Sequence, residues 1–131
     1  MTENLNVDIA RDVRAPAIAR RAVERISSLD GSTLDDTKLL VSELVTNAVK
    51  YGDGADVHLR VSARGPHQVR VEVVDEGAGF IPVARHRSPT EPGGWGLPTV
   101  GALADRWGVR EGSTLVWFEL DRRPPEARPA R

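Results

Sequence analysis

Residues 73–80 have the sequence VVDEGAGF, in which a strand-like run ends at two closely spaced glycines. Two β-branched residues lead into Asp75, as expected for a buried strand that stops at a polar turn. Gly77 and Gly79 then follow with a single alanine between them. One glycine is enough for a tight turn, so the second indicates that something must approach the backbone closely. A turn started by Asp75 is the simpler alternative, because D-x-G-x-G alone is a weak motif.

The composition is that of a globular chain of 131 residues, 40% of them hydrophobic, which is long enough to bury one core. The 18 basic and 19 acidic residues give a net charge of −1, which does not indicate direct binding to nucleic acid or to a membrane. The absence of cysteine excludes disulfides, thiolate metal sites and thiol nucleophiles. No apolar run suits a signal peptide or a membrane span. The sequence therefore predicts a soluble, cytoplasmic, single-domain protein.

Hydrophobic periodicity predicts the first half of the chain as one strand and two helices. Residues 7–13 alternate as a strand, and Pro16 then opens a helix that continues over 17–29. The helix has one apolar stripe, formed by Ala15, Ile18, Ala19, Ala22, Val23 and Ile26. Thr33 and Asp36 have the spacing of a capping box, which predicts a second helix from about residue 34 to Tyr51, ended by Gly52.

The second half of the chain is predicted to be mainly extended. Residues 56–63 and 68–75 alternate as a hairpin around the turn RGPH, and 113–120 form a last strand. A mobile loop is expected over 80–94 and a third helix over 97–107, whereas 122–131 is predicted to be a disordered, basic, Pro-rich tail to a domain of residues 1–121. This order predicts an α+β two-layer sandwich, in which helices cover one face of a mostly antiparallel mixed sheet.

The second helix carries polar side chains that could serve chemistry. Glu43, Asn47 and Lys50 fall within an arc of about 60° beside the apolar face. They form either a solvated face with a charge pair or a carboxylate and an amide oxygen directed at one spot. An asparagine supplies a neutral oxygen for Mg²⁺, and an acid one turn earlier could accept a proton.

A glycine-rich stretch, GGWGL at 93–97, lies where the predicted loop meets the third helix. Glycines that expose the N–H groups at a helix N-terminus can form a phosphate site, because those donors have no partner within the helix. A flexible hinge followed by a helix cap is the alternative.

These three segments, in this order, resemble the boxes of the GHKL ATPase superfamily, whose Bergerat fold occurs in gyrase, histidine kinases and MutL. The E-x-x-x-N box corresponds to Glu43–Asn47, D-x-G-x-G to Asp75–Gly79, and G-x-G-L to Gly94–Leu97. A threonine after a glycine-containing turn, Thr114, also matches. The resemblance extends over about residues 7–120.

The resemblance implies an ATP site with magnesium. Asp75 would accept a hydrogen bond from the adenine amino group, and Thr114 would support the base through a shared water. Asn47 would hold Mg²⁺ between the phosphates, and Glu43 would be the general base. The remaining residues implied to contact ATP are Lys50, Gly77, Gly79, Gly94, Gly96 and Leu97.

Within the superfamily, the short chain resembles stand-alone anti-sigma factor serine kinases of the SpoIIAB and RsbW type. The likeness is close in SELVTNAVKYG and ALADRWGV, although Thr99 replaces an aliphatic residue of the third box. The implied partners are a sigma factor and a STAS-domain antagonist that is phosphorylated on serine, and a homodimer is compatible with the resemblance. Arg20, Arg21 and Arg25 form either a partner-binding face or a solvated basic edge. The alternative function is a nucleotide-gated interaction module with little catalysis.

Overall fold

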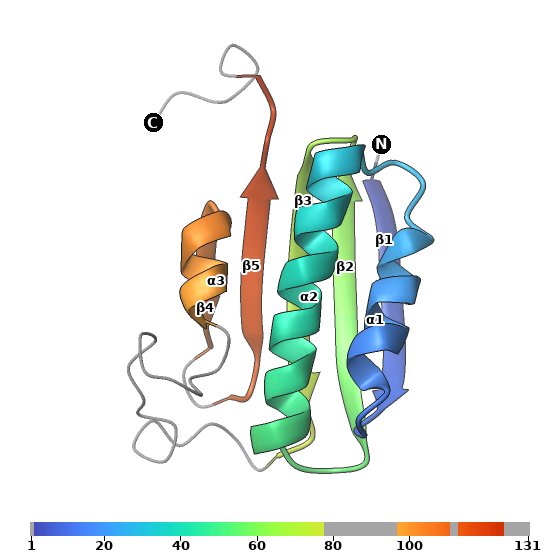
Figure 1. Cartoon of the computed structure of the whole chain (residues 1–131), viewed down its shortest axis with the longest axis vertical. Helices are drawn as coiled ribbons and strands as arrows, with labels where there is room; N and C mark the ends of the chain where they lie inside the picture. The colour runs from blue at the N-terminus through green and yellow to red at the C-terminus, as the bar shows by residue number, and fades with distance from the viewer. Residues whose placement is uncertain (1, 78–96, 111–112, 125–131) are drawn as a thin grey trace.

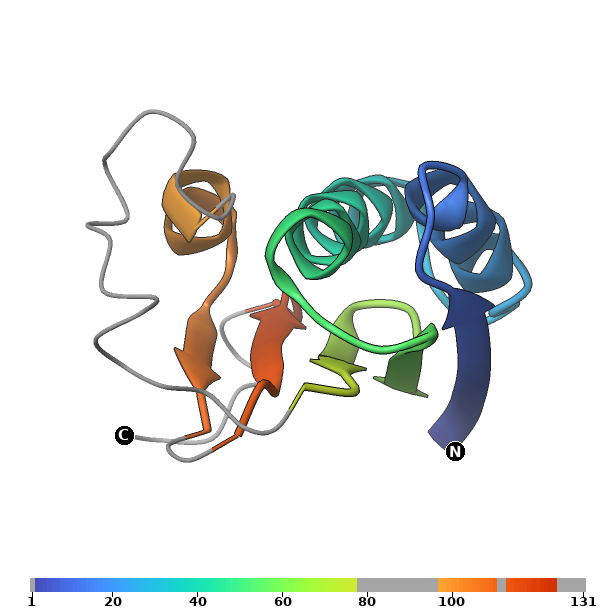
Figure 2. The same cartoon turned by 90° about the horizontal axis from the view of Figure 1, so that it is seen from below.

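The structure is a computed structural model that describes residues 2–77, 97–110 and 113–124. The described chain forms two layers, with three helices on one face of a five-stranded sheet (Figures 1 and 2). This arrangement confirms the predicted α+β two-layer class. In chain order the elements are β1 (Thr2–Ala10), α1 (Ala15–Glu24), α2 (Gly31–Tyr51), β2 (Asp56–Arg64), β3 (Gln68–Asp75), α3 (Leu97–Leu103), β4 (Arg106–Val109) and β5 (Val116–Asp121).

The strands lie in the order β1-β2-β3-β5-β4, and all four pairings among the described residues are antiparallel. The predicted hairpin of β2 and β3 is confirmed, with Val61 opposite Val71 and a left-handed Gly65 (φ 70°) in its turn. Phe118 of β5 lies on the other side of Val71. β3 therefore lies between β2 and β5, and its last residue, Asp75, is paired with Val57 of β2.

The core lies between the sheet and the helices. Alternate residues of the central strands are buried, such as Leu59, Val71 and Phe118, and they pack against Leu40 and Val45 of α2. This alternation buries one face of each strand, as the period of two predicts. The intervening residues form the opposite face of the sheet, which no described helix covers (Figure 2). None of the described helices is long and apolar enough to cross a membrane.

The start of α2 differs from the predicted capping box. Asp30 is the N-cap, and its Oδ1 accepts a hydrogen bond of 2.8 Å from the backbone N–H of Gly31. Thr33 lies inside the helix and is buried, while Asp36 forms an ion pair of 3.4 Å with Arg122. The prediction of a Thr33–Asp36 box is wrong because the helix begins at Gly31, before Thr33, and Asp36 pairs with Arg122 instead.

Other helix and strand boundaries also differ from the predicted ones. β1 covers Thr2–Ala10 rather than 7–13, and α1 ends at Glu24, with Ile18 exposed instead of in the buried stripe. The predicted third helix ends at Leu103, and β4 follows it along the edge of β5. A four-residue strand containing Gly108 has no usable periodicity, so pairing with β5 alone defines it.

The C-terminal end of the described chain is attached to the domain. The backbone N–H of Arg122 donates to the carbonyl of His67 at 2.7 Å, and its Nη2 donates to the carbonyl of Leu103 at 2.7 Å. Arg122 falls within the tail that the sequence predicts to be disordered, yet it joins three parts of the fold. Residues 125–131 and the predicted loop at 80–94 lie outside the described residues.

Candidate nucleotide site

The C-terminal end of α2 meets the end of β3. Gly52 ends the helix as predicted, and its backbone N–H donates to the carbonyl of Ala48 at 3.0 Å. A Cβ added to Gly52 would lie 2.6 Å from Oδ2 of Asp75. The helix that carries Glu43 and Asn47 therefore ends directly against the acid of the D-x-G-x-G segment.

Asp75 is 5% exposed at the end of β3. Its Oδ1 accepts hydrogen bonds from the backbone N–H groups of Gly77 at 2.7 Å and of Asp53 at 3.5 Å. A Cβ on Gly77 would lie 2.9 Å from the same oxygen, so the missing side chain permits this close approach. Asp75 thus does start a local turn, and it also places a buried carboxylate beside a bare backbone.

Thr114, in the segment before β5, contacts Asp75 and lies beside Gly77. It is buried, and its Oγ1 donates a hydrogen bond of 3.1 Å to the backbone carbonyl of Asp75. Its Cγ2 would lie 3.4 Å from a Cβ on Gly77. The structure therefore brings together Asp75, Gly77 and Thr114, which the resemblance implies are in contact with ATP.

Asn47 is half-buried on α2, and its Nδ2 is buried without a hydrogen-bond partner among the described residues. No hydrogen bond among the described residues therefore holds this N–H₂ group in place. Glu43, one turn earlier, is half-buried, and Lys50 is exposed. No group of three His, Asp or Glu side chains in the described residues could hold a metal alone, so Mg²⁺ at Asn47 would need phosphate oxygens and water.

Part of the predicted site lies outside the described residues, namely Gly79, Gly94 and Gly96. Leu97 is the first residue of α3.

Of the arginines assigned to partner binding, Arg21 and Arg25 are exposed on or just after α1, whereas Arg20 donates a hydrogen bond of 2.8 Å to Ser42 of α2. Arg20 therefore also joins the two helices.

Glu76 was not singled out from the sequence, although it fills the first variable position of D-x-G-x-G. Hydrogen bonds from the backbone N–H groups of Asp56 and Ala55 hold the pKa of Glu76 below its ordinary value. His58 lies between Asp8, at 2.6 Å from its Nδ1, and Glu76, at 3.4 Å from its Nε2. The hydrogen bond to Asp8 raises the pKa of His58, with a smaller contribution from Glu76. No local pattern could have revealed these long-range contacts.

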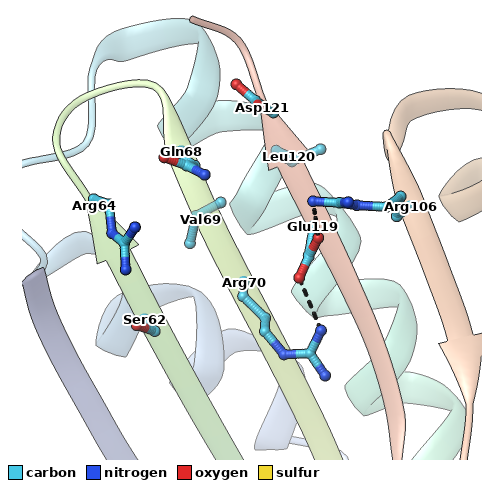
Figure 3. A pocket seen from close by; sticks show the side chains of 9 residues that line it. All are labelled: Ser62, Arg64, Gln68, Val69, Arg70, Arg106, Glu119, Leu120 and Asp121. Carbon is cyan, nitrogen blue, oxygen red and sulfur yellow. Dashed lines mark hydrogen bonds and ion pairs between the residues drawn. The ribbon is translucent and has the colours of Figure 1, made fainter. Parts of the chain in front are cut away.

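A hollow of about 220 Å³ lies on the face of the sheet that the helices leave open (Figure 3). Arg70 and Arg106 both form ion pairs with Glu119 there, at 2.9 and 2.6 Å. These side chains alternate with core residues along their strands, so they point away from α2. The hollow is therefore separate from the site formed by Asn47 and Asp75.

Comparison with known proteins places the chain in a family. Residues 8–120 match the family model of the histidine kinase-like ATPase domain, and the chain belongs to that family. Membership in an ATPase family implies that the nucleotide is ATP. No curated protein matches the sequence.

A solved structure supports the same fold. The crystal structure of the RsbU and RsbW domains of Rv1364c from Mycobacterium tuberculosis matches with a TM-score of 0.60 and 24% identity. The match covers 92% of this chain and 32% of that chain, so the present chain spans about a third of the structure it resembles.

Proposed function

We infer that this chain is a cytoplasmic, ATP- and Mg²⁺-dependent serine-protein kinase, which acts as an anti-sigma factor and phosphorylates a STAS-domain antagonist. The observation that carries the proposal is the convergence of Asp75, Gly77 and Thr114 at the end of the helix that bears Glu43 and Asn47. The likeness to a structure that contains an RsbW domain supports it.

The described residues fit the binding steps of phosphoryl transfer. The buried carboxylate of Asp75 would accept a hydrogen bond from the adenine amino group, and such a charge-assisted bond is strong. The unpartnered amide of Asn47 would supply one oxygen to Mg²⁺ beside the phosphates. When bound, the ion neutralises the charge that develops on the phosphates.

Glu43 would carry the proton transfer. It lies one helical turn before Asn47, so a γ-phosphate bound beside that amide would also lie near this carboxylate. Glu43 would accept the proton of a serine hydroxyl on the docked partner. The serine oxygen would bond to the γ-phosphorus as the bond from that phosphorus to the departing ADP oxygen breaks.

The test is single-turnover transfer from labelled ATP to a STAS-domain partner by the wild type and by Glu43→Gln. A lost general base is expected to slow transfer by about 10²- to 10⁴-fold while ATP affinity is retained. Asp35→Asn, which changes an exposed acid on the same helix, is the matched control and should transfer at the wild-type rate.

Equal transfer by Glu43→Gln and the wild type would rule out Glu43 as the base. If the wild type transfers no phosphate but binds the partner tightly only with ATP, the protein is a nucleotide-gated interaction module and not a kinase.

A further inference from the structure

The loop that joins α2 to β2, residues 52–55, lies directly against Asp75. The backbone N–H of Asp53 donates to Oδ1 of Asp75, and the carbonyl of Asp53 accepts from the backbone N–H of Glu76 at 3.1 Å. Gly52 faces the other carboxylate oxygen closely enough to leave no room for a Cβ. Together with the Gly77 N–H, which donates to the same Oδ1, this loop therefore sets how the Asp75 carboxylate is oriented.

Arg11, in the connection from β1 to α1, holds the loop by its carbonyl groups. Its Nε donates to the carbonyl of Gly54 and its Nη1 to the carbonyl of Val49, both at 2.8 Å. Its backbone N–H donates to the carbonyl of Ala55, also at 2.8 Å. Because Val49 lies in the last turn of α2, one side chain joins the helix end and the loop.

Glu76 holds the same loop by its N–H groups. Its Oε1 accepts from the backbone N–H of Ala55 at 2.7 Å and of Asp56 at 3.0 Å. Gly54 has a φ of +90°, and a Cβ there would overlap the Cβ of Glu76, so the loop packs tightly on this side chain. Arg11 and Glu76 thus bind complementary backbone groups of one short loop.

We propose that Arg11 and Glu76 are positioning residues, which fix the Asp75 carboxylate through residues 52–55 so that it selects the exocyclic amino group of adenine. The proposal rests on the proposed assignment of Asp75 to adenine. A carboxylate hydrogen bond is directional, so a displaced loop weakens recognition of the amino group. Contacts to the phosphates, which lie elsewhere on the nucleotide, are expected to persist.

The experiment compares calorimetric affinities for ATP and for purine riboside triphosphate, which lacks only the 6-amino group, both with Mg²⁺. The wild type should prefer ATP by about 10- to 100-fold, as expected for a hydrogen bond to a charged group. Asp75→Asn, as the reference, should lose most of that preference. Glu76→Ala and Arg11→Ala should each lower the preference by about fivefold or more, with the affinity for the analogue nearly unchanged.

Two variants separate positioning from a general loss of structure. Glu76→Gln retains an oxygen that can accept both loop N–H groups, so it should keep the preference within about twofold. Glu72→Ala removes an acid from the open face of β3, the strand that precedes Glu76, where it pairs with Arg70, and should leave the preference unchanged. Should Glu76→Ala not fold, Arg11→Lys carries the test, because lysine cannot bond both carbonyls with the same geometry.

The outcomes are distinct. If the variants of Arg11 and Glu76 keep the wild-type preference, or weaken both ligands equally, positioning is overturned while the proposed site stands. If Asp75→Asn itself keeps the preference in a protein that binds ATP, the adenine assignment fails, and the positioning proposal fails with it.

Discussion

The hydroxyl of Thr114 donates a hydrogen bond of 3.1 Å to the backbone carbonyl of Asp75, which lies 39 residues earlier in the chain. A threonine hydroxyl has one proton and two lone pairs. Since the proton is committed to the main chain, Thr114 can only accept from a water molecule or a base. A water shared between Thr114 and adenine would therefore have to donate to Thr114, which refines the role that the sequence implied.

Asn47→Ala should leave the fold intact and abolish most Mg²⁺-dependent ATP affinity. The buried Nδ2 has no partner among the described residues, so alanine removes no hydrogen bond seen in the fold, and alanine favours helices. We expect the free energy of unfolding to change by less than about 1 kcal/mol. Urea unfolding and calorimetry with and without Mg²⁺ measure the two effects.

Thr46→Ala, at the preceding half-buried position of α2, is the control for Asn47 and should bind Mg-ATP normally. If Asn47→Ala unfolds, and its folded fraction still binds Mg-ATP, then Asn47 is a structural residue and not a metal ligand.

Gly52→Ala should destabilise the protein by about 1–3 kcal/mol and weaken ATP binding, because the new Cβ would collide with the Asp75 carboxylate and the carbonyl of Ala48. Gly31→Ala is the matched glycine at the other end of α2, where a Cβ would meet nothing within 4 Å. It should be neutral or stabilise by up to about 1 kcal/mol. Equal unfolding midpoints for the two variants would contradict the close approach at Gly52.

Stability should fall as the pH rises above about 6.5, the ordinary pKa of histidine. Folding raises the pKa of His58, chiefly through the hydrogen bond to Asp8. A group with a raised folded pKa stabilises fully below its unfolded pKa, and this contribution is lost as the pH passes through the folded value. The neighbouring charges on the same face are Asp8 of β1, Asp56 and Arg60 of β2, and Glu76 after β3.

His58→Gln and Asp8→Asn should both flatten this dependence, as measured by urea unfolding between pH 5.5 and 9. Glu76 acts in the opposite direction, because its lowered pKa makes its contribution disappear as the pH falls through the folded value. An unchanged slope above pH 6.5 in both variants would show that the Asp8–His58 contact does not influence stability.

The folded domain should extend to Arg122. A chain that ends at Pro124 retains the bonds of Arg122 to His67 and Leu103, whereas one that ends at Asp121 loses them. We expect the shorter chain to be less stable by about 1–3 kcal/mol in urea unfolding.

In the 131-residue chain, Arg122→Ala should show part of that loss, since its backbone N–H remains. Arg14→Ala, which removes an exposed ion pair with Asp12, is the control and should change stability by less than about 1 kcal/mol. If the two truncated chains unfold at the same urea concentration, the domain ends at residue 121, as the sequence predicted.

The sequence alone was sufficient for the class of the fold and for the family to which the chain belongs. The hairpin of β2 and β3 follows from alternation along each strand, which is a local property. The spacing of Glu43 and Asn47, and of Asp75 and Gly77, is likewise a local property, because each pair lies within a few consecutive residues. The role of Asp30 as the cap of α2, by contrast, was hidden by a competing Thr33–Asp36 pattern that tertiary packing overrides.

Only the tertiary structure revealed how the site is held together. Arg11 reaches Gly54 across 43 residues, and Thr114 reaches Asp75 across 39. The sequence of β4 does not predict a strand, and this segment is extended because it pairs with β5. Periodicity and caps report interactions between residues a few positions apart, whereas these contacts arise when the sheet brings distant segments together. The sequence therefore determined the class of the fold and predicted which groups could act on a nucleotide, whereas the packing of α2 against β3 and its loop decided where the Asp75 carboxylate lies.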